Sequence, residues 1–250
     1  MWIPFGRLKC KNKMALYLPK SKALMILIPK TGCIWRYEAL EKLDIEYVRW
    51  DDICKRTWSP HYTASHYMCT CNKKFQRKHK DCFKGEQIDF IATFVRHPVA
   101  WYESIWKYYQ YRTRKEPRRM RWDVRKVGKN NIKDQITFDD WVDTMLTNHP
   151  LWYTRAIDLY CGPPEAEWCH WIGRTETLEE DWLEILEILG YQINDEQKEL
   201  IHSMGPENQS TTETITWNPE LKQRVIEMEH EVIERFYGEN IGQRKFGIYK

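Results

Sequence analysis

A lysine follows an apolar run in the stretch LMILIPKTGCIWRYEALEKL at residues 24–43. The apolar residues predict a buried strand, and the spacing that follows predicts a helix over 33–43. In a strand–loop–helix unit the first free amides of the helix point at a bound anion, and the helix dipole adds to them. Gly32 lets the backbone come close, and Lys30 supplies positive charge. An ordinary turn with a solvated lysine is the alternative that this loop alone leaves open.

A second motif, FVRHPVAWYESIWKYY, occupies residues 94–109. It places Arg96 at the end of a predicted strand over 88–95 and Ser104 within a predicted helix over 98–111. An arginine binds phosphate through its charge and fork geometry, and a serine adds a hydroxyl. The two motifs together predict a ligand with two separate anionic ends.

A P-loop-like nucleotide kinase is the alternative enzyme. Its loop needs G-x-x-x-x-G-K-[ST], with the lysine after the second glycine. Here Lys30 precedes Gly32. A kinase also uses an acidic residue at a later strand end to hold magnesium, whereas the 88–95 strand ends at Arg96. Both differences count against phosphoryl transfer from ATP.

Strand patterns alternate with helix patterns along the chain. This alternation predicts an α/β fold with a mainly parallel sheet, whose ligands lie beyond the carboxyl ends of the strands. The predicted strands are 23–28, 45–50, 88–95 and 167–173, and the predicted helices are 33–43, a short one near 61–68, 98–111, one near 138–147, 177–190, 194–202 and 218–237.

Length and composition indicate one folded domain. The 250 residues are 42% hydrophobic, which excludes a disordered chain. We expect a single domain over 1–250, with a Cys/His/Lys-rich insertion near 51–87 and a basic loop near 112–136. The formal charge is only +3, but residues 107–133 are basic and aromatic. This patch indicates an anionic partner, or else a solvated helix face and loop, and a non-enzymatic nucleic-acid-binding module is the alternative that would use it.

Three segments in order resemble sulfotransferases. PKTGCIW at 29–35 resembles their 5′-phosphosulfate loop, and RHPVAWYES at 96–104 resembles their 3′-phosphate motif. IGRTETLEEDWLEILEILG at 172–190 resembles their third strand and the helix after it. The resemblance covers residues 22–238 and is strongest to the carbohydrate-modifying members.

The resemblance implies a fold, a donor and a reaction. The fold would be the sulfotransferase fold, a P-loop-like central parallel β-sheet flanked by helices. The donor would be 3′-phosphoadenosine 5′-phosphosulfate (PAPS), and the product would be the 3′,5′-bisphosphate PAP. The sulfuryl group would go to a hydroxyl or amine of an acceptor, with a glycan expected, and no metal would be required. Nucleic acid is not an expected partner under this interpretation.

The resemblance also implies roles for individual residues. Lys30 would bind the oxygen that bridges phosphate and sulfate and stabilise the leaving group. Arg174 is a further nucleotide candidate, and an arginine in a strand-end ion pair is the alternative for it. The residues expected at the nucleotide are Lys30, Thr31, Gly32, Cys33, Ile34, Trp35, Arg96, Ser104 and Arg174. The family often has hydroxyl residues where Cys33 and Ile34 stand, so donor affinity could be lower than usual.

The attacking hydroxyl must lose its proton to a base. His61 in H-Y-T-A-S resembles the H-x-x-A element of several carbohydrate sulfotransferases and is the first candidate. His66 is the second. Glu38 and Glu41, on the helix after the lysine loop, are the third option.

A cysteine and histidine cluster follows in HYMCTCNKKFQRKHKDC at 66–82. Four side chains of this kind can bind zinc, but the C-x-C…H-x-x-C spacing matches no common zinc template, so we expect no metal site there. The five candidate ligands are His66, Cys69, Cys71, His79 and Cys82.

The start of the chain, MWIPFGRLKCKNK, lacks the apolar region of a signal peptide, and no run approaches the ~20 apolar residues of a membrane helix. With eight cysteines, these features favour a reducing cytoplasmic location. A cropped luminal domain would have the same features.

Overall fold

The computed structural model describes residues 15–49, 88–115, 136–166, 169–205 and 214–238. Its contacts divide the chain into two compact units. The sheet unit includes the described residues up to Arg96 and those from Ala156 to 205, and the helical unit includes those from His97 to Arg155 and from 214 to Gly238. The single domain expected from the sequence stays a prediction.

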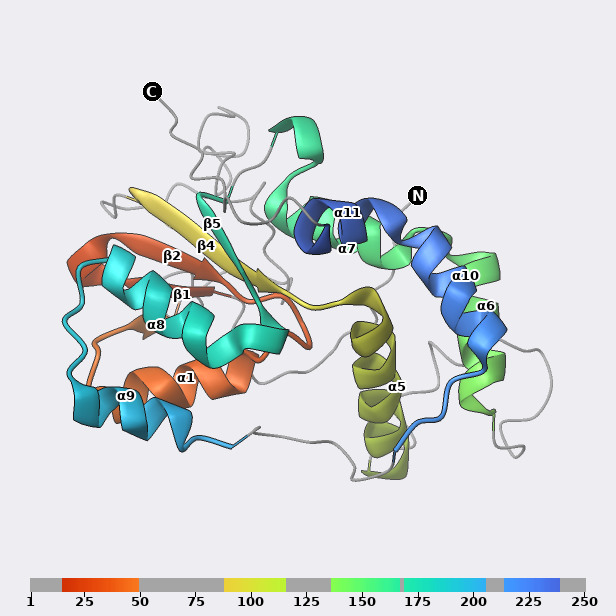
Figure 1. Ribbon diagram of the computed structural model, residues 1–250, viewed down its shortest axis with the longest axis horizontal. Coiled ribbons are helices and arrows are strands. Elements are labelled where there is room, and N and C mark those ends of the chain that lie inside the picture. Colours follow the sequence, from red (N-terminus) through yellow and green to blue (C-terminus); the bar gives the residue numbers. More distant parts are fainter. Residues whose placement is uncertain (1–14, 50–87, 116–135, 167–168, 206–213, 239–250) are drawn as a thin grey trace. The chain divides into compact units, whose positions relative to one another are not determined.

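The sheet unit contains a five-stranded sheet in the order β3-β1-β2-β4-β5 (Figure 1). β4 pairs in parallel with both β2 and β5, while β1 pairs antiparallel with β2 and β3. The predicted α/β fold is therefore confirmed, with a parallel core and one antiparallel strand. The strand bounds are β1 Ala15–Leu18, β2 Ala23–Ile26, β3 Val48–Arg49, β4 Phe90–Val95 and β5 Trp171–Arg174.

Two strands differ from the sequence prediction. β1 was not predicted, because four apolar residues carry too little periodicity to indicate a strand. A short 3₁₀ turn, Pro19–Ser21, joins β1 to β2, and Lys22 closes it at a φ of +49°. β3 is only Val48–Arg49, although 45–50 was predicted, because the pairing of β3 with β1 covers only two residues.

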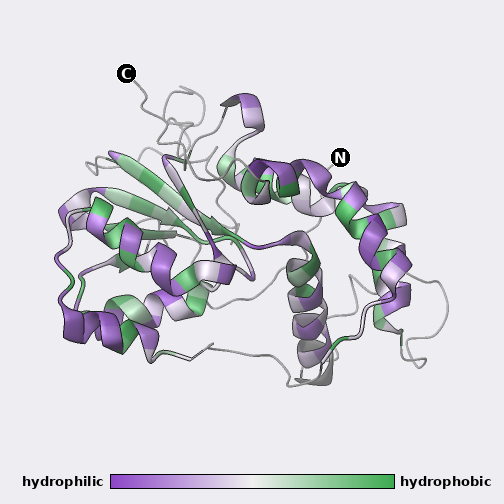
Figure 2. Cartoon of the chain, viewed as in Figure 1, coloured by the Kyte–Doolittle hydropathy of each residue, from purple (hydrophilic) through white to green (hydrophobic). Residues whose placement is uncertain are grey.

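One face of the sheet packs on three helices, α1, α8 and α9 (Figure 1). Alternate strand residues meet helix residues spaced three or four apart, as the two side-chain periodicities require. In Figure 2 strands β2 and β4 are largely green and α9 is largely purple, and Ile201 is the buried residue of α9. The core includes Leu16, Leu18, Ala23, Met25, Ala92, Phe94 and Trp171 from the strands and Trp35, Ala39, Leu40, Trp182, Ile185, Leu186 and Ile201 from the helices.

These three helices were predicted, and the structure confirms them. α1 spans Cys33–Lys42, α8 spans Leu178–Ile188 and α9 spans Asp195–His202. Gly190, expected to close the second of them, has a φ of +78° just after its end. A left-handed residue at this position is the usual way for a helix to stop.

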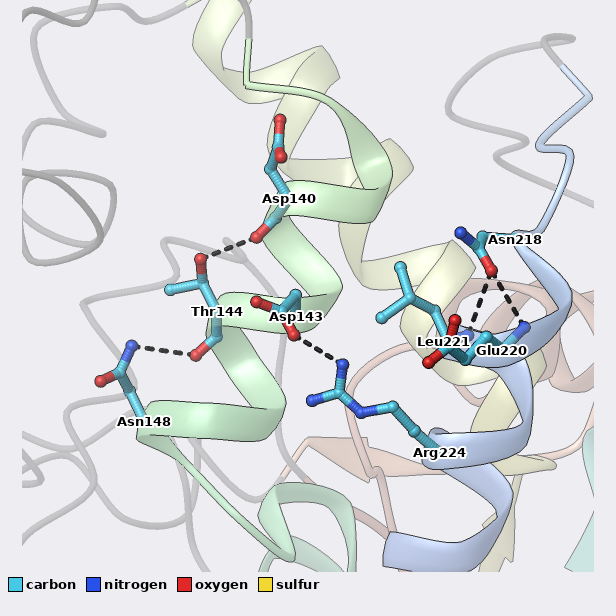
Figure 3. A network of polar contacts seen from close by, with 8 residues as sticks. All are labelled: Asp140, Asp143, Thr144, Asn148, Asn218, Glu220, Leu221 and Arg224. Carbon is cyan, nitrogen blue, oxygen red and sulfur yellow. Dashed lines mark hydrogen bonds and ion pairs between the residues drawn. The ribbon is translucent and has the colours of Figure 1, made fainter.

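The helical unit contains α5, α6, α10, α11 and the first turn of α7. Their bounds are α5 Pro98–Lys115, α6 Phe138–Asn148, α7 Trp152–Cys161, α10 Pro219–Met228 and α11 His230–Tyr237. An aromatic core holds this unit together, in which Trp101 lies 4.9 Å from Trp152 and 4.6 Å from Tyr153 between ring centroids. Arg224 of α10 forms a 2.7 Å ion pair with Asp143 of α6 (Figure 3).

Three helix predictions need correction. The helix expected over 218–237 is two helices that meet at Glu229. α7 was not predicted. α5 continues through Lys115, so residues 112–115, expected in the basic loop, are helical.

Glu229 explains the break. This carboxylate is fully buried and accepts four hydrogen bonds, from the Tyr102 hydroxyl (2.9 Å), the Tyr153 amide (3.1 Å) and the amide and hydroxyl of Thr154 (2.8 Å each). The two amides belong to the first turn of α7, where a negative charge also meets the helix dipole. Burial, and secondly the charge of Glu229, raise the pKa of the Tyr102 hydroxyl well above its ordinary value. Long-range partners of this kind have no signature in the local sequence.

We predict that Glu229→Ala destabilises the protein by about 3 kcal/mol or more, since bonds to a buried charge contribute most and four donors lose their acceptor. Denaturant unfolding of the wild type and the variant measures this difference. The control is Glu227→Ala, whose exposed side chain should matter by less than about 0.5 kcal/mol. Similar losses in both variants would show that the Glu229 bonds do not stabilise the α7 start.

Candidate functional site

The candidate site lies in the sheet unit, at the carboxyl edge of its parallel strands. The lysine loop follows β2, Arg96 follows β4, and Arg174 is the last residue of β5. The register pairs Ile26 with Thr93 and Val95 with Arg174, so all three strands run toward this edge. In open α/β sheets this edge is where ligands bind.

The loop between β2 and α1 has an unusual backbone. Lys30 has a φ of +72° and Gly32 a φ of +75°. A side chain at position 32 would also collide with α8, because a Cβ there would lie 2.7 Å from a methyl of Leu178. Strained conformations of this kind persist where the surroundings hold them, and they concentrate at binding sites.

The loop ends at the start of α1. Gly32 is the N-cap, and the Arg36 amide donates the first helical bond to its carbonyl, at 3.1 Å. The amides of Cys33, Ile34 and Trp35 precede that bond, and helix geometry gives them no acceptor within α1. Gly32 provides no capping side chain either. The start of α1 thus offers the amides that an anion needs.

The side chains of the loop point inward. The fully buried Thr31 donates its hydroxyl to the Ile28 carbonyl at 2.8 Å, and the Cys33 thiol lies 2.9 Å from the same oxygen. The Trp35 indole is buried in the core, 6.4 Å from the Trp182 ring. These three residues therefore leave only their backbone available to a ligand at this loop.

Arg96 lies directly against the loop. Its Nη1 donates to the Lys30 carbonyl at 3.3 Å. The structure thus brings Arg96 of the second motif to the lysine loop, 66 residues away in the sequence.

Arg174 stands at the next strand end. Its amide donates to the buried Asp181 carboxylate at 2.6 Å, while its side chain is partly exposed. No ion pair involves its guanidinium within the described part of the chain. The ion pair that was the alternative role for Arg174 is therefore not formed with any described residue.

Sequence reasoning missed Arg36. This residue lies on α1 and is fully buried, with Nη2 donating to the carbonyl (3.1 Å) and hydroxyl (3.2 Å) of Thr31. The apolar spacing of α1 marked its neighbours as core and gave no reason to bury an arginine among them.

Other predicted site residues lie elsewhere. Ser104 is a partly buried residue of α5 in the helical unit. His61 and the 66–82 cluster lie outside the described residues. Glu41 accepts a hydrogen bond from the Tyr47 hydroxyl at 2.8 Å and sits near the end of α1, about 12 Å of helix rise from Cys33. Glu38 is closer to the start of α1, at about 7.5 Å of helix rise from Cys33.

The described residues contain no group of three or more metal-binding side chains. A separate finding concerns membranes: no helix among the residues that the structure describes is both long and apolar enough to cross one.

The site is thus a strand-end loop with free helix amides, beside a lysine and two arginines. A family model described as the sulfotransferase family matches residues 13–239. The chain belongs to the sulfotransferase family, and its general reaction is the transfer of a sulfuryl group. Comparison with curated proteins finds no match, and neither does comparison with solved structures.

We predict that Gly32→Ala weakens PAP binding at least tenfold and destabilises the fold by about 1–2 kcal/mol, the cost of a left-handed alanine, since the Leu178 methyl that the new Cβ meets is the end of a flexible side chain. Calorimetry with PAP and denaturant unfolding measure the two effects. The matched control is Gly190→Ala, which has a similar φ but open space around the new methyl. It should lose stability and keep its PAP affinity. Unchanged PAP affinity in Gly32→Ala would remove this loop from the binding site.

Proposed function

We propose that the protein transfers the sulfuryl group of PAPS to a hydroxyl or amine of an acceptor, and that the acceptor is a carbohydrate. The observation that carries the proposal is the bond from Arg96 to the Lys30 carbonyl. PAPS has an anionic group at each end of its nucleoside, and this bond brings the Arg96 guanidinium next to the lysine loop.

The 5′ end of the donor fits the loop. The amides at the start of α1 cradle the phosphate, and Lys30 meets the bridging oxygen. The close approach that this requires is consistent with Gly32, which has a φ of +75° and carries no side chain. Arg96 and Ser104 hold the 3′-phosphate, a role that for Ser104 rests on the family resemblance. Arg174 adds positive charge at the same edge of the sheet.

The chemical step exchanges one sulfur–oxygen bond for another. The acceptor oxygen bonds to sulfur as the bond from sulfur to the bridging oxygen breaks, and that electron pair stays on the 5′-phosphate of PAP. Lys30 and the loop amides stabilise the charge that develops there. The acceptor proton goes to a base, for which His61 remains the first candidate. Because this cationic set supplies the charge that magnesium supplies in kinases, the proposal includes no metal. We retain a cytoplasmic location as a proposal.

We predict that PAP raises the melting temperature more than AMP does, because only PAP has a phosphate at both ends. Arg96→Ala should remove most of this difference, about 2 kcal/mol or more of binding free energy for a lost charge-assisted contact. Thermal unfolding with saturating PAP, AMP and ATP measures it.

The control for this experiment is Arg224→Ala, which removes an exposed arginine of α10 that pairs with Asp143. It should leave the PAP–AMP difference intact. Equal shifts for PAP and AMP in the wild type would refute the two-ended site, and a larger shift with ATP would favour the kinase.

We predict that His61→Ala lowers turnover by about 10² to 10⁴, the range for loss of a general base, and leaves PAP binding unchanged. An unperturbed imidazole titrates near neutral pH and accepts a proton readily. The measurement is transfer from radiolabelled PAPS to a panel of glycans, with PAP calorimetry on each variant.

His66→Ala and Glu38→Gln are the comparison variants, and each should have a smaller effect. Near-normal turnover in His61→Ala, with loss in either of the others, would reassign the base. Loss of PAP binding in His61→Ala would instead make this histidine structural.

A further inference from the structure

Arg36 is a buried cation beneath the loop. Its side chain is fully buried, and its guanidinium lies 4.7 Å from the centre of the Phe94 ring in the sheet core. Only Nη2 has hydrogen-bond partners, namely the Thr31 carbonyl and hydroxyl and, at 3.6 Å, the Cys33 sulfur. Nε and Nη1 have no hydrogen-bond partner among the described residues.

This charge is not compensated by a carboxylate within the described residues. Burial lowers the pKa of Arg36, and the neighbouring Cys33 thiol opposes that shift. A buried charge without a carboxylate partner is costly, and the contact with the Phe94 ring offsets only part of that cost. An apolar side chain of similar volume often stabilises a core better. Packing alone therefore gives no reason for an arginine at this position.

The contacts of Arg36 indicate a reason. Thr31, which it binds twice, lies between Lys30 and Gly32, the two residues of the loop with positive φ. Holding the Thr31 carbonyl and hydroxyl fixes the backbone on both sides of it. Arg36 also places a positive charge behind the amides that face the ligand.

We propose that Arg36 is a positioning residue of the donor site. It holds the Thr31 turn in its binding conformation, and its buried charge is offset when the 5′-phosphate of the donor occupies the loop. The inference rests on the proposed function. It predicts that removing the charge of Arg36 weakens anion binding more than it lowers the stability of the free protein.

The test compares Arg36→Met, Arg36→Lys and Leu40→Ala. Methionine has a similar length and no charge, while lysine keeps the charge and loses the fork. Leu40 is a fully buried core residue of α1 beyond the loop, so its truncation is a purely structural control. Each variant is measured for its melting temperature without ligand and for its affinity toward PAP and inorganic pyrophosphate, at a temperature where circular dichroism shows it folded.

We expect the affinity for PAP to fall at least tenfold in Arg36→Met and by a smaller factor in Arg36→Lys. Leu40→Ala should lower the melting temperature and leave affinity within about twofold, since it changes no contact of the loop. Arg36→Met should lose less melting temperature than Leu40→Ala. If Arg36→Met does not fold, Arg36→Lys decides the matter, and an affinity equal to that of the wild type overturns the inference.

The pyrophosphate measurement separates this inference from the proposed function. If the wild type binds pyrophosphate but not PAP, the donor assignment fails, and the Arg36 inference is judged on pyrophosphate alone. If the wild type and Arg36→Met bind PAP equally, the inference fails and the donor assignment stands. If the wild type binds neither, both are wrong.

Discussion

The parallel pairing of β4 with β2 and β5 is the constraint on which the candidate site depends. Parallel strands end at the same edge, so a fixed register brings the residues after each strand together whatever their separation in sequence. The pairs Ile26–Thr93 and Val95–Arg174 set this register. They bring Arg96 to the Lys30 carbonyl and leave Arg174 one strand away. A slip of one residue would turn every side chain of a strand to its other face.

Two buried charges, Glu229 in the helical unit and Arg36 in the sheet unit, have very different hydrogen-bond partners. Glu229 has all four of its donors and joins the junction of α10 and α11 to the start of α7. Among the described residues, Arg36 has hydrogen-bond partners on one nitrogen only, and it lies under a strained loop. A satisfied buried charge makes a structure specific, whereas a partly satisfied one reduces stability unless something else uses it. Under the proposed function, the anionic donor is the candidate for that use.

The candidate loop offers backbone groups rather than side chains to a ligand. The sequence has Cys33 and Ile34 where hydroxyl residues are common in the family, which suggested a weaker site. The structure turns the Thr31 hydroxyl and the Cys33 thiol toward the Ile28 carbonyl. A site built on amides depends less on the identity of these side chains than on the conformation of the loop. That conformation rests on Gly32 and on the bonds that Arg36 makes to Thr31.

The sequence by itself determined the α/β class, most helices and the loop and strand ends of the site, because apolar periodicity and glycine and proline positions are local signals. It missed α7, and it missed β1 because a four-residue strand has no clear period. It also merged α10 with α11, because the break at Glu229 is fixed by hydrogen-bond partners 75 to 127 residues away. Only the tertiary structure decided that Arg96 touches the lysine loop and that Arg36 is buried beneath it. Both facts depend on strand register and on packing between α1 and the sheet, and these are set by contacts that no local stretch of sequence contains.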